Sequence, residues 1–412
     1  MVLSMLVETF HKVDNRLKKK SRGDGMFFLA YGLIISFSLL AESFYFRYFD
    51  EFPFTMLQLC CVGILGLWEL YNGGVDRKDW PAMFVCGGFC VLAIIIAESN
   101  VQRLVGWVFL ATFCARRIPF PKIADFTLRV SCVVVAFIVL SGYLGIIDDV
   151  VVHKSGRIRE YLGFRYALYP SGILLNMTAL YVYVRKNRIT VLGALVWGVI
   201  NWYVYYMTDS RISFLLAELL LVAGLAMRWM PKLVRKLHVW WGALVASFAV
   251  CGGLSMIMIS CYNSRIPWMR RLNSALEGRL NLGKRSLTKY GVTLFGQKIE
   301  WIGNGLDVNG NPVEQTYDYV DCLYVKVLQR YGLVFSVLLL VLITWAMFRL
   351  WKRREYHLLL ISATVAVHCL LDDLSFSLHY NTFWIALGIV LIAPSMLPWN
   401  GKTNQLSLPR RE

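Results

Sequence analysis

Four polar segments interrupt an otherwise apolar sequence, and each contains side chains that could do chemistry. They are GRIREYLGFRY at 156–166, MTDSRISF at 207–214, NSALEGRLNLGKRSLTKYGVTLFG at 273–296 and HCLLDDLSFSLHYN at 368–381. The first three carry arginines, whose planar guanidinium groups present a fork of donors suited to phosphate or carboxylate oxygens. The fourth combines His379 with Asp372, and such a pair can act as a general base near neutral pH. A plain hydrogen-bonding role for His379 is the alternative.

The segment 273–296 is the most concentrated of these. It holds one acidic residue, Glu277, and four cations: Arg279, Lys284, Arg285 and Lys289. Apolar residues recur at helical spacing around its start, at Trp268, Leu272, Leu276 and Leu280. This predicts an amphipathic helix of about three turns on a membrane surface, with Arg279 on its apolar side unless Gly278 ends the helix first. Either way, Arg279 points to the boundary between protein and membrane. Binding of lipid head groups by these cations is the alternative.

Arg159 and Arg211 each precede an apolar run, where an arginine near membrane depth is costly and usually paired or functional. A solvated loop for Arg159, and a structural pair between Arg211 and Asp209, are the simpler alternatives. Asp318 and Asp321 are three residues apart at the start of another apolar run, so a helix would place them on one face. That face could help a hydroxyl lose its proton, or it could be a solvated helix N-terminus.

The elements that position these residues are membrane helices. The 412-residue chain is 57% hydrophobic and only 17% charged, whereas soluble domains carry about 25% charged residues. Its apolar runs approach the length that crosses a bilayer as a helix, about 20 residues. We therefore predict an all-α polytopic membrane protein of about twelve spans. They lie near 26–46, 52–71, 80–97, 101–115, 125–147, 166–184, 189–207, 212–229, 238–260, 331–349, 357–373 and 382–397.

Loop charges predict the orientation. With both termini in the cytoplasm, every cytoplasmic connection is basic, as the positive-inside rule requires. The loops 148–165 and 261–330 then lie outside although they too are basic, so topology does not explain their cations. The expected organisation is a cytoplasmic segment 1–25, one transmembrane domain 26–397 and a cytoplasmic tail 398–412.

Other functions lack their motifs. The net charge of +17 follows from membrane topology, and no nucleic-acid-binding motif accompanies it. Walker, GxSxG, HExxH and Rossmann patterns are missing, and no Cys/His cluster suggests a metal. Cys261 and Cys322 flank the long outer loop and could form a disulfide, but two unpaired thiols at helix ends are the favoured interpretation.

In these segments the chain resembles the Wzy-like polysaccharide polymerases, relatives of the O-antigen ligases among glycosyltransferases of the GT-C type. The resemblance covers most of the chain, and it lies in the hydropathy and the order of the sequence features more than in sequence identity. The matching pieces are RIREYLGF, TDSR, LEGRLNLGKRSLTKYGVTLFG, YDYVDCLYVKVLQRYGL and DDLSFSLHYNTF. Arg285 and Gly296 also satisfy an Arg–ten residues–Gly spacing discussed for this family.

The resemblance implies transfer of an oligosaccharide from undecaprenyl diphosphate to a hydroxyl of an acceptor repeat unit. The reaction would take place on the outer face of the bacterial cytoplasmic membrane. It would need no cofactor and no metal, and a chain-length regulator is a possible partner. Expected diphosphate ligands are Arg279 first, then Arg159 and Arg211, with Arg285 secondary. Asp321, His379 or Asp372 would accept the proton of the acceptor hydroxyl.

The related ligases carry a functional histidine in the long outer loop, whereas residues 262–330 contain none here. This difference favours a polymerase over a ligase and leaves the base unassigned. A ligase, or a flippase or other transporter of lipid-linked oligosaccharide, remains the alternative. The long loop follows the ninth predicted span, which does not fit the two similar halves of many transporters.

Overall fold

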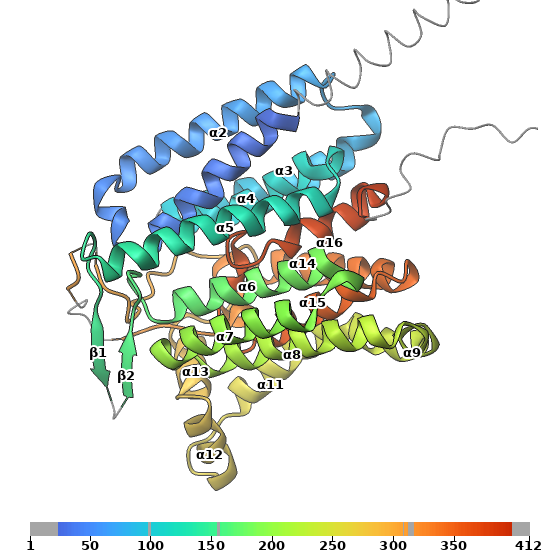
Figure 1. Cartoon of the computed structure of the whole chain (residues 1–412). Helices are drawn as coiled ribbons and strands as arrows, with labels where there is room; N and C mark the ends of the chain where they lie inside the picture. Colours follow the sequence, from blue (N-terminus) through green and yellow to red (C-terminus); the bar gives the residue numbers. More distant parts are fainter. Residues whose placement is uncertain (1–23, 98–99, 155–156, 308, 312–316, 398–412) are drawn as a thin grey trace, which may run out of the picture.

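The computed structural model describes residues 24–97, 100–154, 157–307, 309–311 and 317–397. These residues form a bundle of long helices that lie side by side and run across the view of Figure 1, between two ends of the molecule. The first helix is Asp24–Ala41. The others are α2 (Glu51–Tyr71), α3 (Trp80–Ile96), α4 (Asn100–Cys114), α5 (Phe120–Tyr143), α6 (Leu168–Arg185), α7 (Val191–Thr208), α8 (Arg211–Trp229), α9 (Pro231–Lys236), α10 (His238–Trp241), α11 (Ser247–Cys261), α12 (Pro267–Ala275), α13 (Arg279–Tyr290), α14 (Leu323–Lys352), α15 (Tyr356–His368) and α16 (Phe383–Ile392).

Each of the predicted spans overlaps at least one of these helices, and the span 238–260 covers both α10 and α11 with the 3-10 helix Gly242–Ala246 between them. In the described part of the chain, eight helical segments are long and apolar enough to cross a membrane. They are Asp24–Ala41, Glu51–Tyr71, Arg77–Ile96, Phe120–Tyr143, Val191–Thr208, Arg211–Trp229, His238–Cys261 and Leu323–Lys352. The apolar helices α15 and α16 are shorter, and α4 and α6 do not meet the same criteria. The chain is thus a mostly helical, multi-pass membrane protein.

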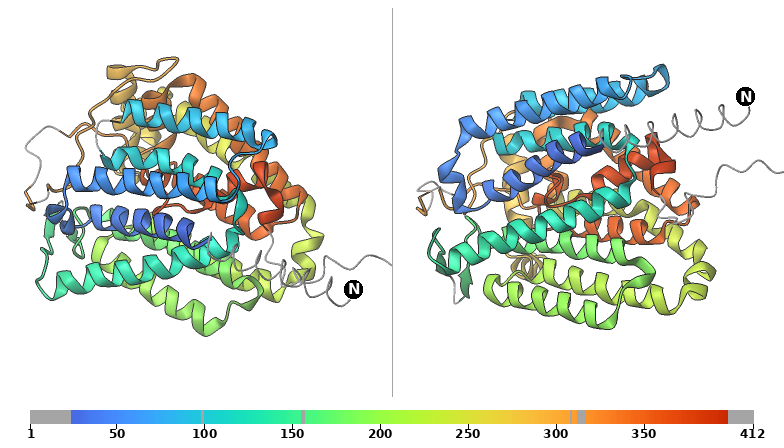
Figure 2. Two further views of the ribbon diagram at one scale, coloured as in Figure 1. Left: turned by 90° about the horizontal axis from the view of Figure 1, so that it is seen from above. Right: turned by 45° about the horizontal axis from the view of Figure 1, so that its top comes forward.

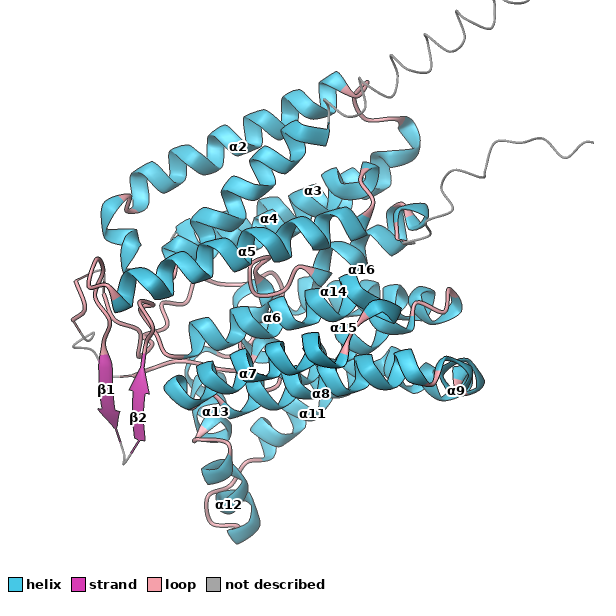
Figure 3. Cartoon of the chain, viewed as in Figure 1, coloured by secondary structure: helices cyan, strands magenta, loops and turns pink. Residues whose placement is uncertain are grey.

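Both long polar loops lie at one end of the bundle. The hairpin of β1 (Val151–Lys154) and β2 (Arg157–Glu160), magenta in Figure 3, and the segment that joins α11 to α14 both project there. The start of the first helix, α9 and the end of α16 lie toward the opposite end in Figures 1 and 2. The two loops predicted to share one side of the membrane are therefore neighbours in space.

The hairpin fixes the position of Arg159. β1 and β2 pair antiparallel, with Val152 opposite Arg159. The chain then passes close to α5 at Gly163, which has a φ of 78°. A Cβ atom there would lie 3.0 Å from the carbonyl oxygen of Ile138, so only glycine fits. This close packing holds the hairpin against the helical bundle.

The long loop between α11 and α14 contains two helices, α12 and α13, where a single continuous amphipathic helix was one of two alternatives. α12 begins at Pro267, and proline is favoured at the first position of a helix. The helix ends at Ala275. Glu277 and Gly278 have φ values of 54° and 87°, and α13 begins at Arg279. The helix thus does not continue through Gly278, which is the second alternative allowed by the sequence, because a left-handed conformation cannot continue a right-handed helix. Arg279 is consequently the first residue of a separate helix, α13.

The prediction of one helical face for Asp318 and Asp321 is wrong. Residues 317–322 are not helical, and α14 begins at Leu323. Asp318 instead forms an antiparallel bridge with Ile302. Its carboxylate and that of Asp321 therefore have different partners. The predicted span 331–349 also starts eight residues too late, since the helix already runs from Leu323.

A kink in α14 ties the long loop to the bundle. Gly332 has a φ of 86°, which interrupts the helix and frees backbone groups of the next turn. Segment 293–297 pairs with them: the Leu333 N–H donates to the Thr293 carbonyl (2.9 Å) and the Gln297 N–H donates to the Arg330 carbonyl (3.0 Å). Backbone groups in the bundle must be satisfied internally, and these bonds do so.

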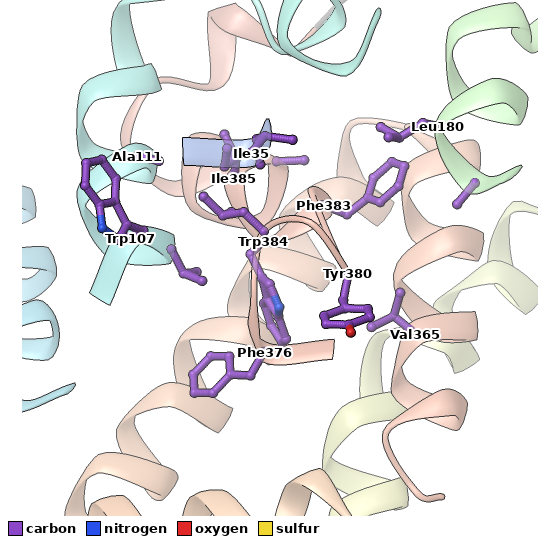
Figure 4. Close-up of a cluster of buried hydrophobic side chains, with 14 of the residues drawn as sticks. Ile35, Trp107, Ala111, Leu180, Val365, Phe376, Tyr380, Phe383, Trp384 and Ile385 are labelled. Atoms are coloured by element: carbon purple, nitrogen blue, oxygen red, sulfur yellow. The ribbon is translucent and has the colours of Figure 1, made fainter. Parts of the chain in front are cut away.

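A buried aromatic cluster lies between the helices. Phe376 and Tyr380 come from the segment between α15 and α16, whereas Phe383 and Trp384 are the first residues of α16. They pack among side chains that include Ile35 and Trp107 (Figure 4). The rings of Phe376 and Trp384 lie 5.5 Å apart. This packing buries segment 369–382 and so fixes the aspartates and the histidine that it carries.

Candidate functional site

Arg279 lies at the centre of the polar region. It is the first residue of α13, and its Nη1 lies 3.9 Å from Oε2 of Glu277 while its Nε lies 3.8 Å from Oδ2 of Asp321. Neither distance is a hydrogen bond. Its buried Nε has no hydrogen-bond partner among the described residues. A buried guanidinium donor without a partner indicates a place for a ligand with an acceptor atom.

Arg159, Arg211 and Arg279 line one cavity of about 90 Å³, which we call the arginine cavity. They come from β2, from the start of α8 and from the start of α13. Arg159 also lies 3.7 Å from Glu277, which therefore sits between two arginines, and the buried Nε of Arg159 lacks a hydrogen-bond partner in the described chain. The structure thus brings three of the four predicted diphosphate ligands to one site.

Arg211 contributes differently from the other two. Its Nε lies 3.2 Å from Oδ1 of Asp209, and its side chain is 58% exposed. The structural pair considered from the sequence is therefore present. Because an exposed ion pair of this kind contributes little to stability, Arg211 can exchange Asp209 for an incoming anion at small cost.

A second cavity, of about 60 Å³, adjoins the first, and we call it the carboxylate cavity. Arg279, Asp372, Leu168 and Leu371 line both. The carboxylate cavity adds Asp321 and Asp373 together with the rings of Tyr166, Tyr317 and Tyr319. Two of the residues predicted as proton acceptors, Asp321 and Asp372, thus lie beside the predicted diphosphate ligand.

Burial alters the acidity of both carboxylates. Desolvation raises the pKa of Asp321 to about 6, against the opposing effect of Arg279. Desolvation and the neighbouring Asp373 also raise the pKa of Asp372. Asp373 itself is bound by Lys326 and accepts a hydrogen bond from the Tyr319 hydroxyl (2.8 Å). Asp321 is therefore ionised near neutral pH yet basic enough to take a proton.

His379 lies elsewhere. Its Nε2 is 3.4 Å from Oε1 of Glu42, and it lines neither the arginine cavity nor the carboxylate cavity. His368 does line the arginine cavity, where its Nε2 lies 3.1 Å from the Ser213 hydroxyl and 3.9 Å from Oδ2 of Asp372. Of the two histidines, the deeper one is the neighbour of the site.

Arg285 also lies outside both cavities. Its guanidinium binds the Tyr317 carbonyl and lies 3.5 Å from Oδ1 of Asp318. Lys289 donates to the same carboxylate at 2.5 Å. Desolvation of the Asp318 carboxylate would raise its pKa, but the hydrogen bonds from Lys289 and Tyr290 act in the opposite direction, and the pKa is lowered. These contacts hold α13 against the strand-like segment before α14, which is a structural role for Arg285.

Sequence reasoning missed a third and larger cavity, of about 350 Å³, which we call the aromatic cavity. Its lining includes the cations Arg165, Lys326 and Arg330 and the rings of Tyr169, Trp301, Tyr319, Tyr331 and Tyr380. It shares Tyr169, Tyr319, Asp373 and Leu374 with the carboxylate cavity. A signal was available in the sequence: Lys326 and Arg330 are four residues apart in an apolar run, so a helix places both cations on one face.

The two cysteines that flank the long loop, Cys261 and Cys322, are both free thiols, so the suggested disulfide is not formed. Among the described residues, no group of three His, Cys, Asp or Glu side chains is placed to hold a metal ion. Fold and cavities together define a multi-pass helical membrane protein with a shielded site of arginines and carboxylates at one end of its bundle. No protein-family model, no curated protein and no solved structure matches this chain.

Proposed function

We propose that the protein is a membrane glycosyltransferase that polymerises oligosaccharide repeat units carried on undecaprenyl diphosphate. The observation that carries the proposal is the convergence of Arg159, Arg211 and Arg279 on one cavity that adjoins the carboxylate cavity, with Asp321 and Asp372 in its lining. Cations from three segments distant in the sequence match a ligand with several negative charges. The carboxylates match an acceptor that must lose a proton.

The arginines would act on the leaving group. When the bond between the anomeric carbon and the phosphate oxygen breaks, its electron pair stays on the diphosphate. Preorganised donors stabilise such developing charge best where water is excluded. Arg279 and Arg159 each have a buried Nε without a hydrogen-bond partner among the described residues, so they can bind phosphate oxygens without first breaking a hydrogen bond there.

A carboxylate would act on the acceptor. As the acceptor hydroxyl oxygen forms its bond to the anomeric carbon, its proton passes to Asp321, with Asp372 as the second candidate. The raised pKa of Asp321, about 6, suits this role because the group is ionised at neutral pH but remains a usable base. Arg279 lies next to both reacting parts and links them.

The proposed location is the outer face of the bacterial cytoplasmic membrane, where the lipid-linked substrate is exposed after translocation. The grouping of both polar loops at one end of the bundle supports a single reaction side. A cysteine placed at Asn309, which is exposed in the long loop, tests the side by labelling in a variant with Cys60 and Cys261 replaced by serine. Labelling from the cytoplasm alone would overturn this topology.

Deletion of the gene followed by analysis of lipid-linked glycans tests the function. If the protein is a polymerase, its loss should leave lipid-linked single repeat units that accumulate outside. If it is a flippase, they should accumulate on the cytoplasmic side. A ligase predicts full-length polymer that stays on its lipid carrier.

Complementation with variants then tests the site. Arg279→Ala should give no polymer at unchanged membrane levels, and Arg285→Ala is the matched control because Arg285 lies outside the cavities. Normal polymer length with Arg279→Ala would refute the proposal.

A further inference from the structure

The aromatic cavity has its own unsatisfied chemistry. Four of the residues that line it carry a buried polar atom without a hydrogen-bond partner among the described residues. These atoms are Arg165 Nε, Trp301 Nε1, Arg330 Nε and the Tyr380 hydroxyl oxygen. Buried polar groups are normally hydrogen-bonded, so four in one cavity indicate that a ligand completes them. All four can donate a hydrogen bond, and the ligand must therefore be rich in acceptors.

The lining of the aromatic cavity holds three cations (Arg165, Lys326 and Arg330) and three carboxylates (Glu42, Glu51 and Asp373). Within the described chain, only one of these cations, Lys326, binds one of these carboxylates. Its partner is Asp373, and Glu42 lies 3.4 Å from His379. Arg165 and Arg330, in contrast, make contacts with neutral groups: Arg165 Nη2 donates to the Ala41 carbonyl, and Arg330 Nη2 donates to the Ile299 carbonyl (2.9 Å). Neither has a carboxylate partner within the described chain. Arg330 is only 5% exposed, and a buried charge of this kind favours an anionic partner.

Aromatic rings surround these cations. Trp301 packs against the Arg330 guanidinium, whose carbon lies 4.7 Å from the ring centroid. Tyr169 and Tyr380 lie side by side, with ring centroids 6.2 Å apart. Flat apolar rings beside a few polar groups are typical of small-molecule sites, and the C–H face of a pyranose packs well on such a ring. The arginine cavity, in contrast, has no aromatic ring other than that of His368 in its lining.

The three cavities form a series. The carboxylate cavity shares lining residues with the arginine cavity on one side and with the aromatic cavity on the other. A ligand in the aromatic cavity therefore reaches Asp373 and Tyr319, next to Asp321. If the arginine cavity holds the diphosphate, the aromatic cavity lies where the acceptor must present its hydroxyl.

We propose that the aromatic cavity binds one pyranose residue that carries a carboxylate, so that the acceptor repeat unit ends in, or near, an acidic sugar. Arg165 and Arg330 bind the carboxylate, Tyr380 and Trp301 bind ring or hydroxyl oxygens, and the aromatic faces pack on the sugar. The placement beside the reacting groups rests on the proposed function. The binding itself does not, because it follows from the cavity alone.

Binding of monosaccharides to the purified full-length protein in detergent tests the inference without requiring turnover. Saturation-transfer NMR titrations compare glucuronic acid with glucose, which has the same ring but no carboxylate, and with pyrophosphate. Glucuronic acid should bind about tenfold more tightly than glucose, as one charge-assisted pair allows. Equal affinity for the two sugars, or binding of neither, would overturn the proposal.

Variants assign the binding to this cavity. Arg165→Gln and Arg330→Gln should abolish the preference for the acid, whereas Arg188→Gln, at an exposed site in a turn after α6, should keep it. Tyr380→Phe removes only a hydroxyl group, so it should weaken the binding of both sugars and leave the ratio of their affinities unchanged. A preference that survives Arg165→Gln and Arg330→Gln places the site elsewhere. Displacement of glucuronic acid by pyrophosphate at lower concentration, lost in the same two variants, would make this a phosphate site and refute the sugar assignment.

Discussion

Arg279 and Asp321 face each other with Nε and Oδ2 3.8 Å apart, close enough to interact electrostatically but too far for a hydrogen bond. Both side chains are largely shielded from solvent. An arginine that fully paired its aspartate would be satisfied, and neither would be available for a substrate. The separation leaves one group free to bind a phosphate oxygen and the other to accept a proton, between the arginine and carboxylate cavities.

If Asp321 is the base, the plot of reaction rate against pH should have an acidic limb, in which the rate falls as the pH is lowered. Desolvation raises the pKa of Asp321 to about 6, and a base acts only when ionised, so the rate should rise with pH through about 6 and level off above it. Initial rates of polymer formation between about pH 5 and 8 measure this. Asp321→Asn should remove most of the activity. Asp318→Asn, which alters a carboxylate outside the cavities, should keep the limb; an unchanged profile in Asp321→Asn would assign the base to another group.

Arg279 should affect both the rate and this pH dependence. Arg279→Lys keeps the charge but loses the fork of donors, and loss of such a donor to a developing anion costs about 100-fold or more in rate. Arg279→Gln also removes the positive charge that lowers the pKa of Asp321, so the acidic limb of its residual activity should move to higher pH. The Lys variant should keep the limb near its original position. The same shift in both variants would contradict this explanation.

The sequence predicted the positions of the helices well because membrane helices depend on local composition, although eight of the described helical segments, against about twelve predicted spans, are long and apolar enough to cross a membrane. Every predicted span contains a helix, since about 20 apolar residues in lipid have few other structures available. The start of α14 was missed because Lys326 and Arg330 make its first turns look polar. In the fold, Lys326 is half-buried beside Asp373, and Arg330 is buried against Trp301. Charge in a membrane helix can mark a site instead of an end.

The sequence predicted three of the arginines that line the candidate site, but it did not predict how the site is arranged. Arg159, Arg211 and Arg279 meet, as the need for an anionic ligand suggested, whereas Arg285 bonds to the backbone of Tyr317. Helical spacing could not separate Arg279 from Arg285, because both lie in α13 and the choice depends on which loop packs against each face. The role of Asp318 depended likewise on its bridge to Ile302, a contact between residues 16 apart in sequence.

The contact between the long loop and the kink in α14 requires Gly296. Its φ is 96°, and an added Cβ would lie 2.4 Å from the Arg330 carbonyl oxygen. Gly296→Ala should therefore destabilise the protein by roughly 2–5 kcal/mol, from the left-handed backbone and the clash together. Thermal unfolding in detergent measures the loss. Gly253→Ala in α11, where an added Cβ meets nothing within 4 Å, is the matched control, and an equal melting temperature for both variants would exclude a special role of Gly296.

Stability at the opposite end of the bundle should depend on Arg116. It is 5% exposed and binds two carboxylates from other elements: Nη1 lies 2.6 Å from Oε1 of Glu69, and Nε lies 3.0 Å from Oδ2 of Asp79. Arg116→Gln leaves these carboxylates without their cation, and breaking a buried pair in this way costs about 3–5 kcal/mol. The ends of α2, α3 and α4 should then separate more easily under heat.

Lys78→Gln tests whether burial, and not charge alone, causes this loss. Lys78 pairs with Asp76 at 3.3 Å before α3, but its side chain is 78% exposed, so loss of this cation should change stability by at most about 1 kcal/mol. Thermal melts of the two variants in one detergent give the comparison. Because Arg116 lines none of the three cavities, glucuronic acid should still bind to the folded Arg116→Gln protein at temperatures below its melt. Loss of that binding in a folded sample would show that the two ends of the bundle are coupled.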